Sequence, residues 1–124
     1  MEIKTFFFDT YALYEIAIGN RNYAPYAKNV AIVTTKLNLM ELFYGLLTKY
    51  GENVADKFYN RFLPYCIGIP DEIIKRSAVF RAANKKKGFS YIDCIGYILS
   101  MELKIKFLTG DGAFENMPNV EFVK

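Results

Sequence analysis

Residues 3–20, with the sequence IKTFFFDTYALYEIAIGN, contain the pattern that decides the fold. Residues 3–8 are short, rich in aromatics and almost uncharged, which predicts a buried strand that ends at Asp9. Residues 10–18 predict a helix, because apolar side chains share one stripe and Gly19 follows as a stop signal. A buried strand followed directly by a helix is the beginning of an α/β fold.

The same alternation continues to the end of the chain. Further short strands are predicted over residues 30–33, 66–69, 105–109 and 120–123. Helices are predicted over residues 24–29, 36–49, 52–63, 70–87 and 91–103, with caps at Thr34 or Thr35 and at Ser90. This order indicates a three-layer α/β/α sandwich around a central, mainly parallel sheet. The length predicts a single domain, residues 1–124.

The composition limits the chemistry. With 52% hydrophobic residues the chain forms a packed globule, and a net charge of +3 is far from that of a polycationic protein. The absence of His excludes histidine-based triads and His-ligated zinc sites. Cys66 and Cys94 form no C-x-x-C pair and are interpreted as buried, reduced thiols. Carboxylates are therefore the main candidates for chemistry.

The sequence contains no recognisable targeting or membrane-spanning segment. Asp9 interrupts the N-terminal apolar run, which is too short for a signal peptide. Nothing approaches the ~20 consecutive apolar residues that a spanning helix needs. We therefore expect a cytoplasmic protein without a membrane partner.

Four carboxylates stand in apolar surroundings: Asp9, Glu41, Asp93 and Asp111. An ionised carboxylate in a buried segment is costly unless something compensates for its charge. Mg²⁺ or Mn²⁺ can compensate for several at once, because these ions prefer oxygen ligands. Asp9 and Asp111 follow strands, where the ligand crevice of an open α/β sheet lies. Asn38 shares a helix face with Glu41. The pattern predicts a metal site.

Each carboxylate also has a structural interpretation. Asp9 could cap the first helix, and Asp93 could complete a capping box with Ser90. Asp111 could serve a turn with the glycine that follows it, and Glu41 could form a buried salt bridge. Four such coincidences in one chain are less expected than one shared site, so the metal-site hypothesis is favoured.

Four motifs carry a resemblance to a known family. They are FDTYAL at 8–13, LMEL at 39–42 with Gly45 behind it, SYIDCIGY at 90–97 and FLTGDGAF at 107–114. Their order and spacing resemble PIN domains, above all the VapC-like ribonuclease toxins, over residues 3–123. The resemblance implies an α/β/α sandwich and cleavage of RNA that depends on Mg²⁺ or Mn²⁺.

The resemblance also implies residue roles and partners. Asp9, Glu41, Asp93 and Asp111 match the catalytic, metal-binding acids, and Thr10 and Thr109 match supporting hydroxyls, with Asn38 added from its place beside Glu41. Many such toxins form homodimers and are silenced by an antitoxin whose tail covers the site. A further acid is often present near the third or fourth motif; here the nearest one is Glu115, which leaves one or two metal ions open.

Basic and aromatic residues are candidates for holding RNA. Six basic residues cluster toward the end of one predicted helix and suit phosphate contacts: Lys75, Arg76, Arg81, Lys85, Lys86 and Lys87. The last three run directly into the loop before Asp93. Bases at a helix C-terminus also follow from the helix dipole, and the sequence leaves both interpretations open. Four tyrosines near the first motif could stack on unpaired bases or simply pack: Tyr11, Tyr14, Tyr23 and Tyr26.

Other functions remain open at this point. The chain could be a PIN nuclease that processes RNA without being a toxin, or a non-catalytic RNA- or protein-binding module of the same fold. A receiver domain is disfavoured because it needs acids before the first strand's Asp and a Lys after a late strand. A small phosphatase is disfavoured because Asp9 lacks the second Asp of a D-x-D pair.

Overall fold

The computed structural model describes residues 2–124. The predicted domain begins at Met1, which lies outside the described residues. Four strands form one sheet in the order β2-β1-β3-β4, and each neighbouring pair is parallel. Their bounds are β1 Lys4–Phe8, β2 Val30–Val33, β3 Lys106–Thr109 and β4 Val120–Phe122. The prediction of a central, mainly parallel sheet is confirmed.

Five α-helices and four 3-10 turns connect the strands in the described part of the chain. The helices are α1 Thr10–Ile18, α2 Lys36–Tyr50, α3 Glu52–Phe62, α4 Asp71–Ala83 and α5 Tyr91–Leu103. The 3-10 turns are η1 Arg21–Tyr26, η2 Leu63–Tyr65, η3 Lys85–Lys87 and η4 Gly112–Phe114. Thr35 and Ser90 cap α2 and α5 as predicted. Gly19 ends α1 with a φ of 77°, a conformation that favours glycine.

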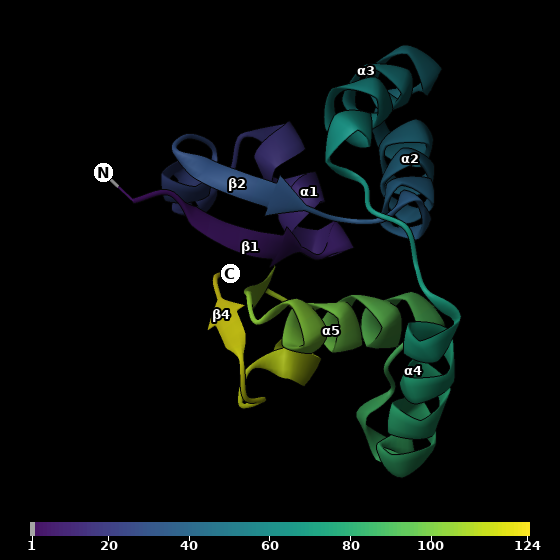
Figure 1. Ribbon diagram of the computed structural model, residues 1–124. Helices are drawn as coiled ribbons and strands as arrows, with labels where there is room; N and C mark the ends of the chain where they lie inside the picture. The colour runs from purple at the N-terminus through teal and green to yellow at the C-terminus, as the bar shows by residue number, and fades with distance from the viewer. Residues whose placement is uncertain (1) are drawn as a thin grey trace.

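The alternation of side chains along the strands creates two cores, one on each face of the sheet. Phe6, Phe8 and Leu108 pack on the core formed with α1, α2 and α3. Phe7 and Phe107 point to the other core, which α4, α5 and η4 complete. Figure 1 shows α5 and α4 on the side of the sheet opposite to α2 and α3. The three-layer α/β/α prediction is thus confirmed.

Gly96 lets α5 approach the sheet closely. A Cβ at this position would lie 2.7 Å from Phe7 Cε1 and 3.1 Å from Phe107 Cε1, in a core that has no space for it. We expect Gly96→Ala to lower the free energy of unfolding by about 1–3 kcal/mol, the usual cost of overpacking a core. Urea unfolding would measure it, with Gly68→Ala as a control, because a Cβ at Gly68 meets nothing within 4 Å. Equal stability of the two variants would contradict this account of the packing.

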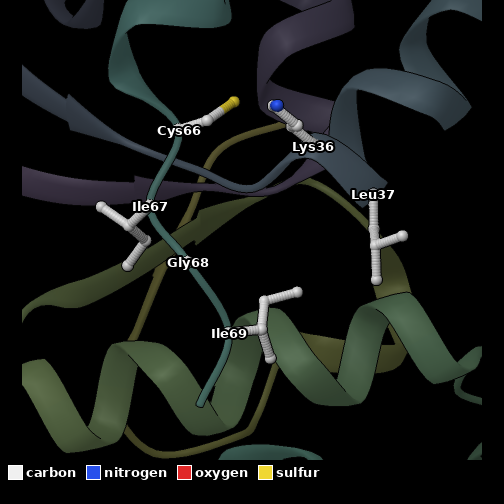
Figure 2. A pocket seen from close by; sticks show the side chains of 6 residues that line it. All are labelled: Lys36, Leu37, Cys66, Ile67, Gly68 and Ile69. Atoms are coloured by element: carbon white, nitrogen blue, oxygen red, sulfur yellow. The ribbon is translucent and has the colours of Figure 1, made fainter.

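Three sequence-based element predictions need correction. Residues 66–69 form no strand, although Thr34 and Cys66 make one isolated parallel bridge. Figure 2 shows this segment passing as irregular chain beside the start of α2. Its pairing stops after the Ile67 N–H donates to Thr34 O, because Thr35 already begins the turn into α2.

The other two corrections concern helix boundaries. The piece predicted over residues 24–29 is the 3-10 turn η1, which begins earlier, because the Asn20 side chain accepts from Asn22 N and caps it. The helix predicted over residues 70–87 ends at Ala83, because the Asn84 side chain donates to Phe80 O and takes the place of the next helical bond.

Cys66 and Cys94 are free thiols, as predicted, but Cys66 is only half-buried and not buried as expected. Cys94 is buried, and burial raises its pKa to about 11, so the thiol stays protonated. Within residues 2–124, no helix combines the length and the apolar character that crossing a membrane requires.

Candidate active site

The strand order places one crevice at the carboxyl ends of β1 and β3. The chain leaves β1 toward β2 on one side and leaves β3 toward β4 on the other, so the two central strands diverge there. In open α/β sheets such a divergence point is where ligands bind. Asp9 directly follows β1 and donates its backbone N–H to Leu108 O, and Asp111 lies two residues beyond the end of β3.

Asp9 is the most buried of the four predicted carboxylates, with 3% of its surface exposed. It stands at the N-cap position of α1, but its side chain makes no capping hydrogen bond, so the interpretation of Asp9 as a helix cap is wrong. Oδ2 accepts a 2.8 Å hydrogen bond from Thr109 Oγ1, which itself accepts from the Asp111 N–H. Oδ1 is buried and has no partner, alone among buried side-chain polar atoms of residues 2–124.

Glu41 is held by a chain of polar side chains that begins at the cap of α2. Thr35 Oγ1 donates to Asn38 Oδ1 at 2.7 Å, and Asn38 Nδ2 donates to Thr10 Oγ1 at 3.1 Å. Thr10 Oγ1 must therefore donate its own proton, which it does to Glu41 Oε1 at 2.6 Å. No basic residue partners Glu41 in the described chain, so the salt-bridge interpretation is wrong.

Asp93 and Asp111 have structural roles as well. Asp93 Oδ2 accepts from the Ser90 N–H at 2.9 Å, and Ser90 Oγ accepts from the Asp93 N–H at 3.0 Å, which completes the predicted capping box. Asp111 Oδ1 accepts from the Ala113 N–H at 3.0 Å, as the turn interpretation requires. These bonds also fix the two carboxylates at the ends of α5 and β3.

All four carboxylates line one cavity of about 440 Å³. Its lining residues are Asp9, Thr10, Tyr11, Tyr14, Glu15, Glu41, Gly45, Asp93 and Asp111. Neither Lys nor Arg is among them. Sequence analysis missed Glu15, which shares the α1 face of Tyr11 at helical spacing. Glu115, by contrast, is exposed and outside this cavity.

The cavity is unfavourable for negative charge. Burial, followed by the charge of Asp93, raises the pKa of Asp9 to about 7. Burial also raises the pKa of Glu41, although the hydrogen bond from Thr10 opposes the effect. The pKa of Asp93 is raised by burial and by the nearby Asp111. The acids thus destabilise one another in the absence of a cation.

The donor set fits a hard divalent cation. Every candidate ligand atom is an oxygen, and the unpartnered Asp9 Oδ1 is a buried acceptor without a donor. In residues 2–124 no three acidic or Cys side chains are grouped closely enough to ligate a single ion by themselves. Mg²⁺ commonly keeps several waters and takes only one or two carboxylates, so this spacing suits it.

Known proteins resemble this chain in part of its sequence and in its fold. No family model matches the chain. A curated VapC ribonuclease of Archaeoglobus fulgidus is 37% identical over 79 residues, which are 60% of this chain and 50% of that protein. The chain therefore spans about half the length of the curated relative it matches.

Solved structures match over nearly the whole chain. The VapC20 toxin of Mycobacterium tuberculosis, a sarcin-ricin loop cleaving toxin, has a TM-score of 0.81 at 15% identity and covers 96% of this chain and 99% of its own. A toxin-antitoxin complex from Klebsiella pneumoniae has a TM-score of 0.70 at 21% identity, with 93% and 94% covered. The fold is that of a VapC-like PIN domain. The resemblance expected from the four motifs is thereby confirmed.

In this PIN fold the lysine run lies apart from the acids. Lys85, Lys86 and Lys87 are exposed and form a separate shallow depression with residues 82–84 at the end of α4. Of the four tyrosines, Tyr23 is buried and donates to Val123 O, and Tyr26 donates to Glu121. Tyr11 and Tyr14 alone of the four line the acidic cavity of the PIN fold.

The hydroxyl of Thr10 is expected to matter for metal affinity. Thr10→Val removes the donor to Glu41 and leaves Asn38 Nδ2 without its acceptor. We expect Mn²⁺ affinity to fall about 10- to 100-fold, the usual cost of losing such a supporting hydrogen bond. Calorimetric titration measures it, and Thr10→Ser, which keeps the hydroxyl, is the matched control. An unchanged affinity in Thr10→Val would show that Glu41 does not depend on this chain of hydrogen bonds.

Proposed function

We propose that the protein is a metal-dependent endoribonuclease that uses Mg²⁺ or Mn²⁺ to hydrolyse RNA. One observation carries the proposal: four carboxylates line a single cavity in which Asp9 Oδ1 is buried without a partner. With all four carboxylates ionised, such a cluster requires a compensating cation. The fold shared with VapC20 and the similarity to a curated VapC ribonuclease support the choice of RNA as substrate.

The residues of this chain supply position and charge. A divalent ion bound here would supply a Lewis acid for activating water and neutralising the scissile phosphate. Asp9, Glu41, Asp93 and Asp111 would hold it together, one or two of them directly and the others through its water molecules. Thr109 orients the carboxylate of Asp9: its hydroxyl accepts a hydrogen bond from the Asp111 N–H and donates its proton to Asp9. Thr10 orients the carboxylate of Glu41 in the same way, accepting from Asn38 and donating to Glu41.

We further propose that the protein is the toxin of a toxin–antitoxin pair and forms a homodimer in the cytoplasm. The toxin-antitoxin complex from Klebsiella pneumoniae shares its fold, which supports an antitoxin partner. An antitoxin segment that carries a basic side chain would complement the acidic cavity, because no Lys or Arg of the described residues lines it.

Metal binding and RNA cleavage together test the function. Calorimetry with Mn²⁺ should show saturable binding. Incubation of the protein with cellular RNA and Mg²⁺ should create new 5′ ends at defined positions, and chelation of the metal should prevent this cleavage. The metal titration comes first, since it needs no knowledge of the specific RNA. If the folded protein bound no Mn²⁺, either with or without RNA, it would be a binding module of the same fold and not a metal-dependent nuclease.

A further inference from the structure

The connection from α4 to α5 concentrates positive charge in the segment that leads to Asp93. From Arg81 to Ile92 the chain contains four basic residues and no acidic one. Asp93, the next charged residue, lines the cavity. The basic segment is therefore joined to the acidic cavity through the first turn of α5. The three lysines in this segment are exposed, whereas Arg81 is half-buried and held in place.

Two contacts fix the guanidinium of Arg81. Its Nε–H donates to Phe89 O at 3.0 Å, and its Cζ lies 4.2 Å from the centre of the Tyr91 ring. Both contacts belong to the turn that leads into the capping box of α5. The terminal nitrogens of Arg81 donate to no acceptor in the described chain, so their donors remain available.

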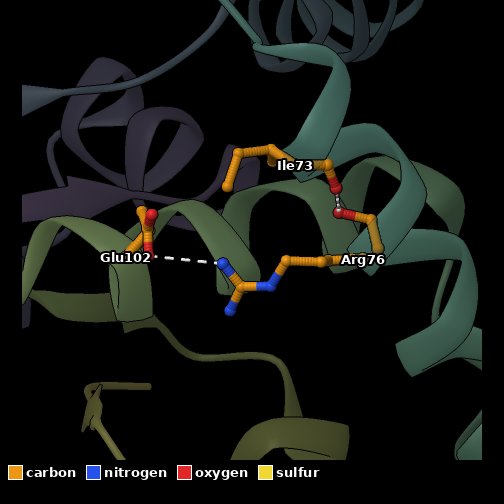
Figure 3. Close-up of polar contacts among 4 residues, drawn as sticks. Ile73, Arg76 and Glu102 are labelled. Atoms are coloured by element: carbon orange, nitrogen blue, oxygen red, sulfur yellow. Dashed lines mark hydrogen bonds and ion pairs between the residues drawn. The ribbon is translucent and has the colours of Figure 1, made fainter.

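Arg76, in the same helix, differs from Arg81 because its charge is paired with a carboxylate. It also reaches from α4 to α5, where its Nη1 lies 3.3 Å from Glu102 Oε2 (Figure 3). That ion pair is the only one within residues 2–124. Arg81 has no carboxylate within ion-pair distance among the same residues. Its charge is positioned but not neutralised, which distinguishes it from Arg76.

Tyr91 adds an aromatic surface to this arginine. The side chain is 67% exposed although its ring is covered by Arg81 on one side, so the remaining surface is open to solvent. An exposed aromatic ring beside a fixed guanidinium is the combination that binds single-stranded nucleic acid, since bases stack on the ring and phosphates take the guanidinium donors.

We propose that Arg81 and Tyr91 form a second RNA-contact site next to the acidic cavity, an inference that rests on the proposed ribonuclease function. Arg81 binds a phosphate of the RNA backbone, and Tyr91 stacks on an unpaired base. The ligand class is single-stranded RNA, in agreement with the positive charge of the whole connection. Lys85, Lys86 and Lys87 add diffuse attraction, while Arg81 provides the fixed contact.

Binding of a short, fluorescein-labelled single-stranded RNA of mixed sequence tests the site. Anisotropy is measured over a range of salt concentrations, with Ca²⁺ in place of Mg²⁺ to slow cleavage. We expect Arg81→Gln to weaken binding and to reduce the slope of log K against log salt by about 0.7, the value for one phosphate contact on a single strand. Arg81→Lys should retain the slope but not the full affinity, because the planar fork is lost.

Tyr91→Ala should weaken binding roughly 5- to 150-fold, the range for stacking of one base, without changing the salt slope. Tyr91→Phe should bind like the wild type. Arg76→Gln is the matched control, because it removes an arginine of the same helix that is already paired. Circular dichroism and a Mn²⁺ titration of each variant verify that the fold and the acidic cavity are intact.

The outcomes separate this proposal from the proposed function. If Arg81→Gln and Arg76→Gln bind RNA with the same affinity and slope as the wild type, the second site does not exist. A wild type that binds Mn²⁺ but no RNA also overturns it and points to a protein partner for this surface. Loss of Mn²⁺ binding in the wild type contradicts the metal-dependent nuclease instead, whatever the RNA affinities are.

Discussion

Asp9→Asn is expected to stabilise the metal-free protein at about pH 8 while it abolishes Mn²⁺ binding and RNA cleavage. The carboxylate is buried, one of its oxygens has no partner, and Asp93 is close enough to disfavour its charge. Asn retains the acceptor for Thr109 and removes the negative charge. The substitution therefore removes the unfavourable free energy of a buried negative charge, which only a bound cation would compensate in the wild type.

The pH dependence gives this prediction its sign. Burial raises the pKa of Asp9 in the folded chain from 3.8 to about 7. Between these values the native state keeps a proton that the unfolded chain has released, so the stability of the metal-free protein falls as pH rises from about 4 to about 7. The full difference corresponds to at most roughly 4 kcal/mol. Asp9→Asn lacks this titration, so its advantage should be absent at about pH 4 and complete above about pH 7.

Thermal unfolding of the wild type and Asp9→Asn across this pH range measures the effect. With Mn²⁺ at about 100 times its dissociation constant the advantage of Asp9→Asn should shrink by about 3 kcal/mol, since ligand binding then stabilises the wild type alone. A wild type that is the more stable protein at both ends of the pH range without metal would contradict the interpretation of Asp9 as a strained cation ligand.

The carboxylates could be predicted from the sequence because each is isolated. Glu41 stands alone between Leu37 and Thr48, and Asp9 directly follows a run of aromatics. An ionised side chain in such a segment is costly unless its charge is compensated, so several of them in one chain favour a shared site. The parallel sheet was predictable for a similar reason, since its strands are short apolar runs separated by amphipathic helices.

The connections between the site residues could not be predicted in the same way. The chain of hydrogen bonds from Thr35 to Glu41 passes through Thr10, which is 28 residues from Asn38 and becomes its neighbour only in the folded protein. Glu15 was missed because its surroundings in the sequence are those of an ordinary helix surface. Residues 66–69 have the composition of a strand, yet their pairing depends on where α2 begins.

Asp93 has two roles, a helix cap that could be predicted from the sequence and a position in the acidic cavity that depends on the tertiary structure. Its capping box follows from the Ser90-x-x-Asp93 pattern, whereas its place in the cavity follows from the docking of α5 on the sheet. A helix cap uses one carboxylate oxygen, Oδ2. The same residue can thus fix the first turn of α5 and take part in cation binding.

Two substitutions separate these roles. Asp93→Asn retains an oxygen that can accept from the Ser90 N–H, so we expect little change in the free energy of unfolding. It should, however, lower the rate of RNA cleavage by more than about 100-fold, because the loss of a direct ligand exceeds the 10- to 100-fold cost of losing a supporting contact. Calorimetry should show a matching loss of Mn²⁺ affinity.

Ser90→Ala should lower the stability of the protein and leave cation binding and cleavage nearly unchanged. It removes the hydroxyl that accepts from the Asp93 N–H and should cost about 1 kcal/mol of stability, the usual value for a lost cap. The carboxylate of Asp93 keeps its hydrogen bond from the Ser90 backbone, so cleavage and Mn²⁺ affinity should remain within a few-fold of the wild type. If Ser90→Ala lowered Mn²⁺ affinity as far as Asp93→Asn does, the order of the first turn of α5, and not the charge of Asp93, would be what binds the cation.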